Sequence, residues 1–394
     1  MTRIDLAGLT ARPAQVWGGI RLVPLVREEP LEGLRLHRQV HGGDGGYGGY
    51  GVVDVGPRTE YVSYIPHGLV ADWSGGTGQP GESAAYGTRL GAYDAGGEPP
   101  PPCVPVRRHH RMVKGERGAK RVRFLPLHLA LEGYLALHFG GPSIVWDEWS
   151  RQAVRQGLSP RAEDAYAGRQ VRGLAEALRV FEIHPGQCGV MVYAADALAA
   201  AFAVPHPDDY RALHPSLIED LYGETVYQYA LYGAPVPEFT ARIDDTGGLR
   251  TLADLRAAAR AQERAWTEAH DGLMARDLLQ TPYAFERVRR MGPYALYRFL
   301  PPFLRGGGQE QHIGELITDH KGRTAYLKTF RLSEKQIRRG YLLRRLADCD
   351  WHLGRTAEAL GTGYAELVAR IRAAGFGSLL DAHAVARGVK AHET

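Results

Sequence analysis

The chain has 394 residues, of which 44% are hydrophobic and 23% charged, and its formal net charge is +4. These values are typical of a folded globular protein and exclude a disordered or fibrous chain. Its three cysteines lie far apart, which argues against a disulfide framework and against a cysteine-based zinc site. We expect a soluble, cytoplasmic protein without membrane contact. The N-terminus lacks the apolar stretch of a signal peptide, and the most apolar run, residues 197–205, is too short to span a bilayer.

The N-terminal part predicts strands that are separated by glycine-rich loops. Residues 18–27 (GGIRLVPLVR) and residues 59–65 (TEYVSYI) have the apolar or alternating pattern of strands. Residues 41–51 (HGGDGGYGGYG) form a Gly/Tyr-rich loop that cannot pack as a regular element. Residues 76–81 (GTGQPG) match a dinucleotide-binding fingerprint. Pro80 and the loop-like surroundings, however, spoil the strand–turn–helix context that such a site requires.

Residues 104–124 predict a basic β-hairpin around a Lys-Gly-Glu-Arg-Gly turn. Eight Lys or Arg residues and one Glu lie between residues 106 and 123. The hairpin is either a solvated basic element or a docking surface for phosphate or nucleic acid. In the second case the contacts would come from Arg107, Arg108, Arg111, Lys114, Lys120 and Arg121.

The rest of the large domain predicts helices followed by strands. Residues 125–180 have a helical pattern, a strand follows at 189–194 (GVMVYA), and further helices are expected up to residue 232. Another helix is predicted over 252–279, and two strands (HIGELITD and RTAYLKTFRL) close the domain. Strands first, helices in the middle and strands last indicate an α+β fold, a large mixed domain over residues 1–330.

No sequence motif in the large domain indicates a particular enzymatic reaction. His206, Asp209 and His214 could gather as ligands, but no zinc spacing fits them. His109 and His110 would point to opposite faces of a strand, so both cannot readily bind one metal ion. A P-loop and the usual hydrolase and metalloprotease signatures are absent from the sequence. We therefore expect no metal and no cofactor, and the catalytic residues, if any, stay unknown.

All of the net positive charge lies in the C-terminal segment. Residues 331–394 hold 11 Lys and Arg against 7 Asp and Glu, whereas the first 330 residues balance at 37 of each. Modules that bind nucleic acids concentrate basic charge in this way. The segment therefore predicts a small all-α domain with a nucleic-acid partner.

Three helices are predicted in this segment. Ser333 and Gln336 form a capping box that opens a helix over 334–348, and a second helix over 355–360 ends at Gly361. Thr362 and Gly363 make a turn. A third helix then begins at Tyr364, places Leu367 and Ile371 on one apolar face, and stops at Gly375. Ala357 is small where the two later helices must cross, which favours helix-turn-helix geometry.

The string TAEALGTGYAELVARIRAAGF resembles the Fis-type helix-turn-helix that ends many bacterial transcription regulators. The resemblance implies that Thr362, Tyr364, Ala365 and Glu366 lie at the start of a recognition helix and that Arg355 and Thr356 touch phosphate. Arg370 and Arg372 add positive charge further along the same helix. The partner would be double-stranded DNA, bound by a homodimer. A helical hairpin that serves only for dimerisation is the alternative.

The order of four segments in residues 15–331 resembles a bacterial family of unknown function that is associated with ADP-ribosylglycohydrolases and rhodanese-phosphatases. The segments are IRLVPLVR, IVWDEWSRQ, HPGQCGVMVYAADAL with LHPSLIEDLYGETVYQYAL, and GELITDHKGRTAYLKTFR. This resemblance points to nucleotide or ADP-ribose biology. If the helical tail binds DNA, the large domain would be a sensory or effector domain that takes a small-molecule or nucleotide ligand. The sequence thus predicts a DNA-binding regulator. The alternative is a nucleotide- or ADP-ribose-related enzyme or binding protein whose helical tail serves dimerisation.

Overall fold

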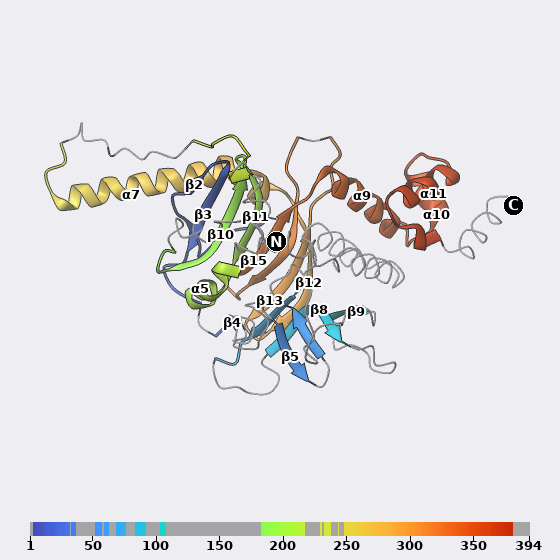
Figure 1. Cartoon of the computed structure of the whole chain (residues 1–394), viewed down its shortest axis with the longest axis horizontal. Coiled ribbons are helices and arrows are strands. Elements are labelled where there is room, and N and C mark those ends of the chain that lie inside the picture. Colours follow the sequence, from blue (N-terminus) through green and yellow to red (C-terminus); the bar gives the residue numbers. More distant parts are fainter. Residues whose placement is uncertain are drawn as a thin grey trace.

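The structure is a computed structural model, and the description covers the following residues: 3–31, 33–36, 52–56, 59–62, 68–75, 83–91, 103–107, 183–216, 229–230, 232–237, 243, 248–306 and 308–380. Within these ranges the chain folds into two β-sheets with several helices (Figure 1). The fold is therefore a mixed α+β fold, as the sequence predicts.

The larger sheet is antiparallel throughout and has nine described strands, in the order β1-β3-β10-β11-β15-β14-β13-β12 with β2 beside β3. Its strands are β1 (Thr10–Ala11), β2 (Gln15–Trp17), β3 (Ile20–Val26), β10 (Gln187–Ala194), β11 (Ala197–Ala203), β12 (Ala284–Met291), β13 (Tyr294–Leu300), β14 (His312–Thr318) and β15 (Thr324–Arg331). The predicted strands in residues 18–27, 189–194, 312–319 and 323–332 are confirmed as β3, β10, β14 and β15.

The smaller sheet has the order β4-β7-β8-β6-β5, and β9 pairs with β8 in the parallel direction. Its strands are β4 (Arg35–Leu36), β5 (Val52–Gly56), β6 (Thr59–Val62), β7 (Gly68–Asp72), β8 (Ser83–Gly91) and β9 (Cys103–Arg107). The strand predicted over residues 59–65 is observed as the shorter β6. The Gly/Tyr-rich loop, the glycine fingerprint from residue 76 on, and the helical pattern over 125–180 lie outside the described residues.

Two elements differ from the sequence prediction. The sequence predicts helices directly after residue 194, but Ala197–Ala203 forms β11. Ala195 and Asp196 both have positive φ, 49° and 61°, which is the geometry of a two-residue hairpin turn. The turn brings the alanine-rich run back along β10, where pairing with β10 and β15 overrides its helix propensity. The sequence pattern also does not reveal β12, a charged strand that, among the described strands, pairs only with β13.

Each face of the larger sheet carries its own hydrophobic core. The first core includes Leu22, Val192, Phe202 and Ile313, and Tyr210 of α5 (Pro207–Ser216) packs into it. The second core, on the opposite face, includes residues such as Met191, Leu316 and Leu327. It is covered by the N-terminal residues 4–11 and by the helical segment that follows residue 251.

This segment confirms the helix predicted over 252–279, with an interruption. It consists of α7 (Leu252–Ala269), a π-helical turn η4 (His270–Met274) and α8 (Arg276–Gln280). The first half of α7 stands clear of the sheet at one side of the molecule (Figure 1). None of the described helices combines the length and the apolar character that crossing a bilayer requires.

At the opposite side, α9 (Glu334–Asp348), α10 (Leu353–Ala359) and α11 (Tyr364–Ala373) project from the sheet (Figure 1). A short 3-10 turn, η5 (Gly377–Leu380), follows them. The first half of α9 packs on the large sheet, because Ile337 and Tyr341 contact the first core. A Cβ atom at Gly340 would lie 2.1 Å from the ring of Phe303, so only glycine allows this close approach. The helix is thus anchored directly on the large sheet.

Candidate nucleic-acid interface

The caps of α9 follow from its flanking sequence. At its start, the backbone N–H of Ser333 donates to Gln336 Oε1 over 2.9 Å, and the N–H of Gln336 donates to Ser333 Oγ over 3.3 Å. The predicted capping box and the bounds 334–348 are both confirmed. At its end, Asp350 and Trp351 adopt positive φ and donate to the carbonyls of Ala347 and Leu346. This is a Schellman motif without glycine.

The connection from α10 to α11 is a Schellman motif with glycine. Gly361 has a φ of +60°, its N–H donates to Glu358 O, and the N–H of Thr362 donates to Ala357 O, both over 3.0 Å. The N-cap of α11 is Gly363, in an extended conformation. The predicted turn and the start of the third helix at Tyr364 are therefore confirmed. The second helix begins at Leu353, two residues before its predicted start.

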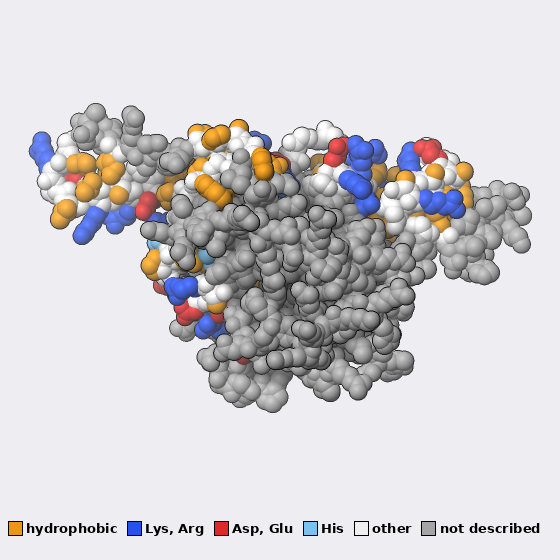
Figure 2. Space-filling model, in the orientation of Figure 1, with side chains coloured by type: hydrophobic (Ala, Val, Ile, Leu, Met, Phe, Trp, Pro, Cys, Tyr) orange, Lys and Arg blue, Asp and Glu red, His pale blue; other side chains and the backbone are white. Residues whose placement is uncertain are grey.

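These three helices share a small core that is separate from the two cores of the large sheet. Leu342 and Leu346 of α9 contribute to it, together with Ala357, Leu367 and Ile371. The predicted inward positions of Leu367 and Ile371 are confirmed, because both side chains are fully buried. The other faces of α10 and α11 stay exposed, and they carry the basic side chains (Figure 2).

Two arginines of the predicted interface are well placed for an anionic partner. Arg355 lies in the first turn of α10, with a side chain that is 61% exposed and forms an ion pair over 3.6 Å with the highly exposed Asp350. Arg372 is exposed near the end of α11, and no ion pair holds it in the described part of the chain. Both guanidinium groups lie at the surface, although Arg355 would have to exchange Asp350 for a phosphate.

The other four predicted residues are placed differently. Thr356 is fully buried, and its hydroxyl donates to His352 O over 2.9 Å, so this side chain stabilises the start of α10 rather than facing outwards. Thr362 and Tyr364 are half-buried at the turn. Arg370 is exposed but forms an ion pair with Glu366 one turn earlier in α11. The hydroxyl of Thr362 and the Arg370 guanidinium lower the pKa of Glu366, which keeps this carboxyl ionised.

The predicted basic hairpin is described only at its beginning. Residues 104–107 belong to β9, which ends at Arg107 and runs parallel to β8. The remaining residues proposed for phosphate contact lie outside the described residues: Arg108, Arg111, Lys114, Lys120 and Arg121.

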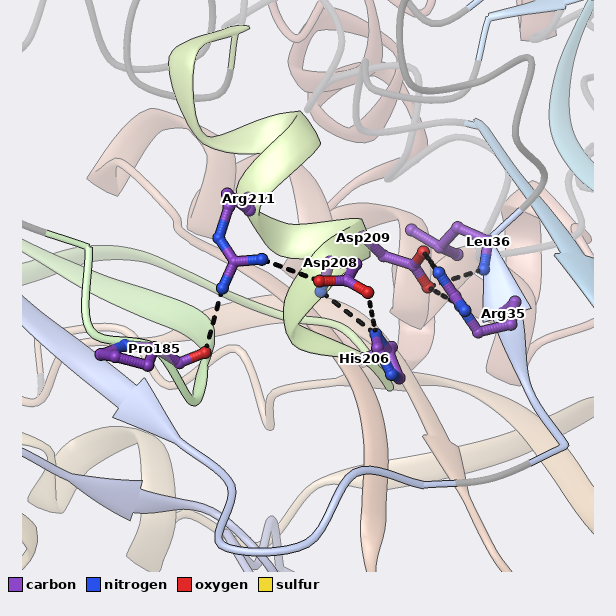
Figure 3. Close-up of polar contacts among 7 residues, drawn as sticks. All are labelled: Arg35, Leu36, Pro185, His206, Asp208, Asp209 and Arg211. Carbon is purple, nitrogen blue, oxygen red and sulfur yellow. Dashed lines mark hydrogen bonds and ion pairs between the residues drawn. The ribbon is translucent and has the colours of Figure 1, made fainter.

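The three residues considered as a metal cluster bind protein groups instead, and Figure 3 shows the contacts of His206 and Asp209. Asp209 is buried and accepts hydrogen bonds from the Arg35 guanidinium, the shortest over 2.8 Å, and from the N–H of Leu36. His206 Nδ1 accepts from the N–H of Asp208 over 3.1 Å. His214 lies 3.0 Å from the Tyr210 hydroxyl, and burial lowers its pKa to about 4. Among the described residues, no three such side chains gather closely enough to hold a metal ion.

A buried polar chain at the π-helical turn has no signature in the sequence. The Tyr193 hydroxyl lies 2.8 Å from His270 Nε2, and His270 Nδ1 lies 2.7 Å from the Asp271 carboxylate. Tyr193 and His270 are both fully buried, and burial raises the pKa of Tyr193 well above its usual value. The phenol therefore stays protonated and links β10 to η4 without acting as a nucleophile.

Cys188 is also a poor candidate for a nucleophile. Its side chain is buried, and burial raises the pKa of the thiol to about 11 even though Arg27 is nearby. The thiolate, which is the reactive form of cysteine, is therefore scarce at neutral pH. This leaves the exposed basic surface of the C-terminal helices as the strongest candidate site in the described part of the chain.

The comparisons with known proteins place the large domain in a family. The model of the ARPP-2 family matches residues 4–292. No curated protein and no solved structure matches the chain. Because the match covers well over half of the sequence, the chain belongs to the ARPP-2 family.

Proposed function

We propose that the chain is a DNA-binding protein, a transcription regulator, in which α10, its glycine turn and α11 form a helix-turn-helix. The observation that carries the proposal is the exposure of Arg355 and Arg372 on two successive helices that project from the large sheet. A helix of ten residues such as α11 is about 15 Å long, and the major groove, about 12 Å wide, admits one.

The division of α11 into two faces supports this role. Leu367 and Ile371 hold the helix against the small core, while Ala365, Glu366 and Arg370 are exposed. Small and charged side chains near the start of such a helix would reach base edges, and the carboxylate of Glu366 would accept from the amino group of a cytosine. Arg355 and Arg372 would contact phosphates on either side. The large ARPP-2 domain would then be the sensory or effector part.

Fluorescence anisotropy on a mixed-sequence DNA duplex tests the proposal. The full chain is compared with Arg355→Glu/Arg372→Glu between about 50 and 200 mM salt, where phosphate contacts make affinity depend strongly on salt. The variant should bind at least tenfold more weakly at the lower salt. In addition, its slope of log affinity against log salt should fall by about 2, because removing each arginine that binds a phosphate lowers the slope by about one.

A matched control removes the effect of net charge. Arg256→Glu/Arg260→Glu makes the same charge change on the exposed face of α7, on the other side of the molecule (Figure 1). This control should bind DNA like the unchanged chain. Equal losses in both variants, or no salt-dependent binding by the unchanged chain, would exclude the proposal and favour the alternative that the helices serve dimerisation.

A further inference from the structure

A groove runs along α9 where the C-terminal helices meet the large domain. Its volume is 690 Å³, and it lies between Arg305 of the loop after β13, α9, and the ends of α10 and α11. A second hollow of 720 Å³ continues it beside Leu304, Gly306, Gly308, Gln309 and Gln311 and shares Arg305, Glu334 and Arg338 with it. These volumes are in the range of about 300–1,000 Å³ that is usual for small-molecule sites.

The lining of the groove combines an apolar floor with a basic rim. Leu342, Leu360 and the ring of Tyr341 contribute to the floor. The basic side chains around it are Arg305, Lys335, Arg338, Arg339 and Arg370, and Glu334 is the one acidic residue among the described lining residues. An anion with an apolar or planar body would match both parts of this surface.

The pairing of these charges shows which cations a ligand would meet. Glu334 is engaged by Arg338, and Arg370 is engaged by Glu366. Arg305 and Lys335 make no ion pair within the described part of the chain, and both remain exposed. Two unpaired cations beside one groove favour a ligand with two phosphate groups.

The aromatic part of the groove suggests what such a ligand carries. The Arg305 guanidinium, which lines the groove, lies 5.7 Å from the centre of the Tyr341 ring, and that of Arg345, which does not line it, lies 5.3 Å away. Tyrosine rings and guanidinium planes are surfaces on which planar rings stack. We propose that the groove binds a nucleoside diphosphate or a close chemical relative, and that the bound ligand weakens DNA binding.

Arg370 connects the two activities, because it lines the groove and belongs to the exposed face of α11. A phosphate group that draws Arg370 into the groove separates it from Glu366 and removes its positive charge from the DNA-facing side of α11, which weakens the attraction to the DNA backbone. This regulatory part rests on the proposed DNA-binding function, whereas the ligand site itself does not. Ligand and DNA are therefore expected to compete with each other.

Isothermal titration of the full chain with ADP, without DNA, tests the ligand site. ADP should bind more tightly than adenosine or inorganic phosphate, because each of these lacks one of the two parts that the groove recognises. Arg305→Ala/Lys335→Ala should weaken ADP binding at least tenfold, and the matched pair Arg256→Ala/Arg260→Ala on α7 should leave it unchanged. Absence of ADP binding, or equal binding by the groove variant, would overturn the site.

Anisotropy with DNA then tests the regulatory part. Saturating ADP should weaken DNA binding at least fivefold in the unchanged chain and have no effect in Arg305→Ala/Lys335→Ala. DNA binding that ADP does not change would overturn the regulation. If the unchanged chain binds no DNA at all, the proposed function fails, while the titration still decides the ligand site. If the groove variant loses DNA affinity and ADP does not bind, the groove is a track for the DNA backbone and the ligand proposal is wrong.

Discussion

Glu315 and Lys328 face each other across β14 and β15, with both side chains withdrawn from solvent. Lys328 Nζ lies 3.3 Å from Glu315 Oε2, and the side chains are 2% and 0% exposed. Burial lowers the pKa of the Lys328 ammonium, and the neighbouring carboxylate of Glu315 opposes this effect. The strand register continues the row of alternating charges to Arg298 and then to Glu286 at the exposed edge strand. Of these four charged side chains, only those of Glu315 and Lys328 are almost completely buried.

The pair predicts a clear difference between single and double substitutions. Lys328→Met should lower the free energy of unfolding by about 3–5 kcal/mol, because it leaves the carboxylate of Glu315 buried without a partner. The double variant Lys328→Met/Glu315→Leu should recover most of this loss, since two apolar side chains tolerate burial without needing each other. Urea unfolding at neutral pH measures both values. If the double variant is no more stable than the single one, desolvation of an unpaired charge is not the cause of the loss.

At the scale of elements, the turn between α10 and α11 depends on one backbone conformation. Gly361 has a positive φ, and a Cβ added there would meet nothing within 4 Å. Any cost of a side chain at this position is therefore conformational and not steric. Gly363 is also free of neighbours within 4 Å, but its φ of −72° is accessible to every residue.

These two glycines make a matched test. Gly361→Ala should destabilise the pair of helices by about 1–2 kcal/mol, the cost of a left-handed conformation for an L-residue. Gly363→Ser should change their stability by less than about half of that amount, because serine is at least as favourable as glycine at an N-cap with this φ. Hydrogen exchange measured by mass spectrometry on peptides covering residues 353–373 reports the local destabilisation. Equal protection in both variants would show that the turn relaxes to another conformation at little cost.

At the scale of the whole molecule, the sheet extends beyond the segment that matches the family. The match ends at residue 292, in the turn between β12 and β13, whereas β13, β14 and β15 complete the sheet. Without them β12 loses its one partner among the described strands, and β11 loses its pairing with β15. The first half of α9 then closes the first core through Ile337 and Tyr341. The large domain therefore depends physically on residues past 330, where the sequence pattern predicts its end.

Truncation tests this dependence. A chain ending at residue 330 should be less stable than one ending at residue 348, because it lacks Leu332 and the packing of α9 against Phe303. Burial of each large apolar side chain contributes about 1.5–3 kcal/mol, so a difference of several kcal/mol is expected. Thermal unfolding followed by circular dichroism compares the two chains with the full one. Equal midpoints for the two truncated chains would place the boundary of the large domain at residue 330 after all.

The C-terminal helices show which structural features the local sequence can predict. The capping box at Ser333, the left-handed Gly361 and the inward spacing of Leu367 and Ile371 each depend on residues within a few positions of one another. Because such interactions join residues that are close in the sequence, the bounds of α9 and the turn before α11 could be predicted from it. Exposure of Arg355 and Arg372 follows from the same helical periodicity.

Other features depend on contacts between residues that are distant in the sequence, and only the tertiary structure decided them. The alanine-rich run becomes β11 only because β10 and β15 lie on either side of it. Arg305 and Lys335 line one groove because Phe303 packs against Gly340 and holds the loop over α9. By itself, the sequence determined the local elements, the strands with strong apolar patterns and the basic charge of the tail. Strand order, the buried charge pair and the groove required the fold, because their energies come from pairings that no short stretch of chain contains.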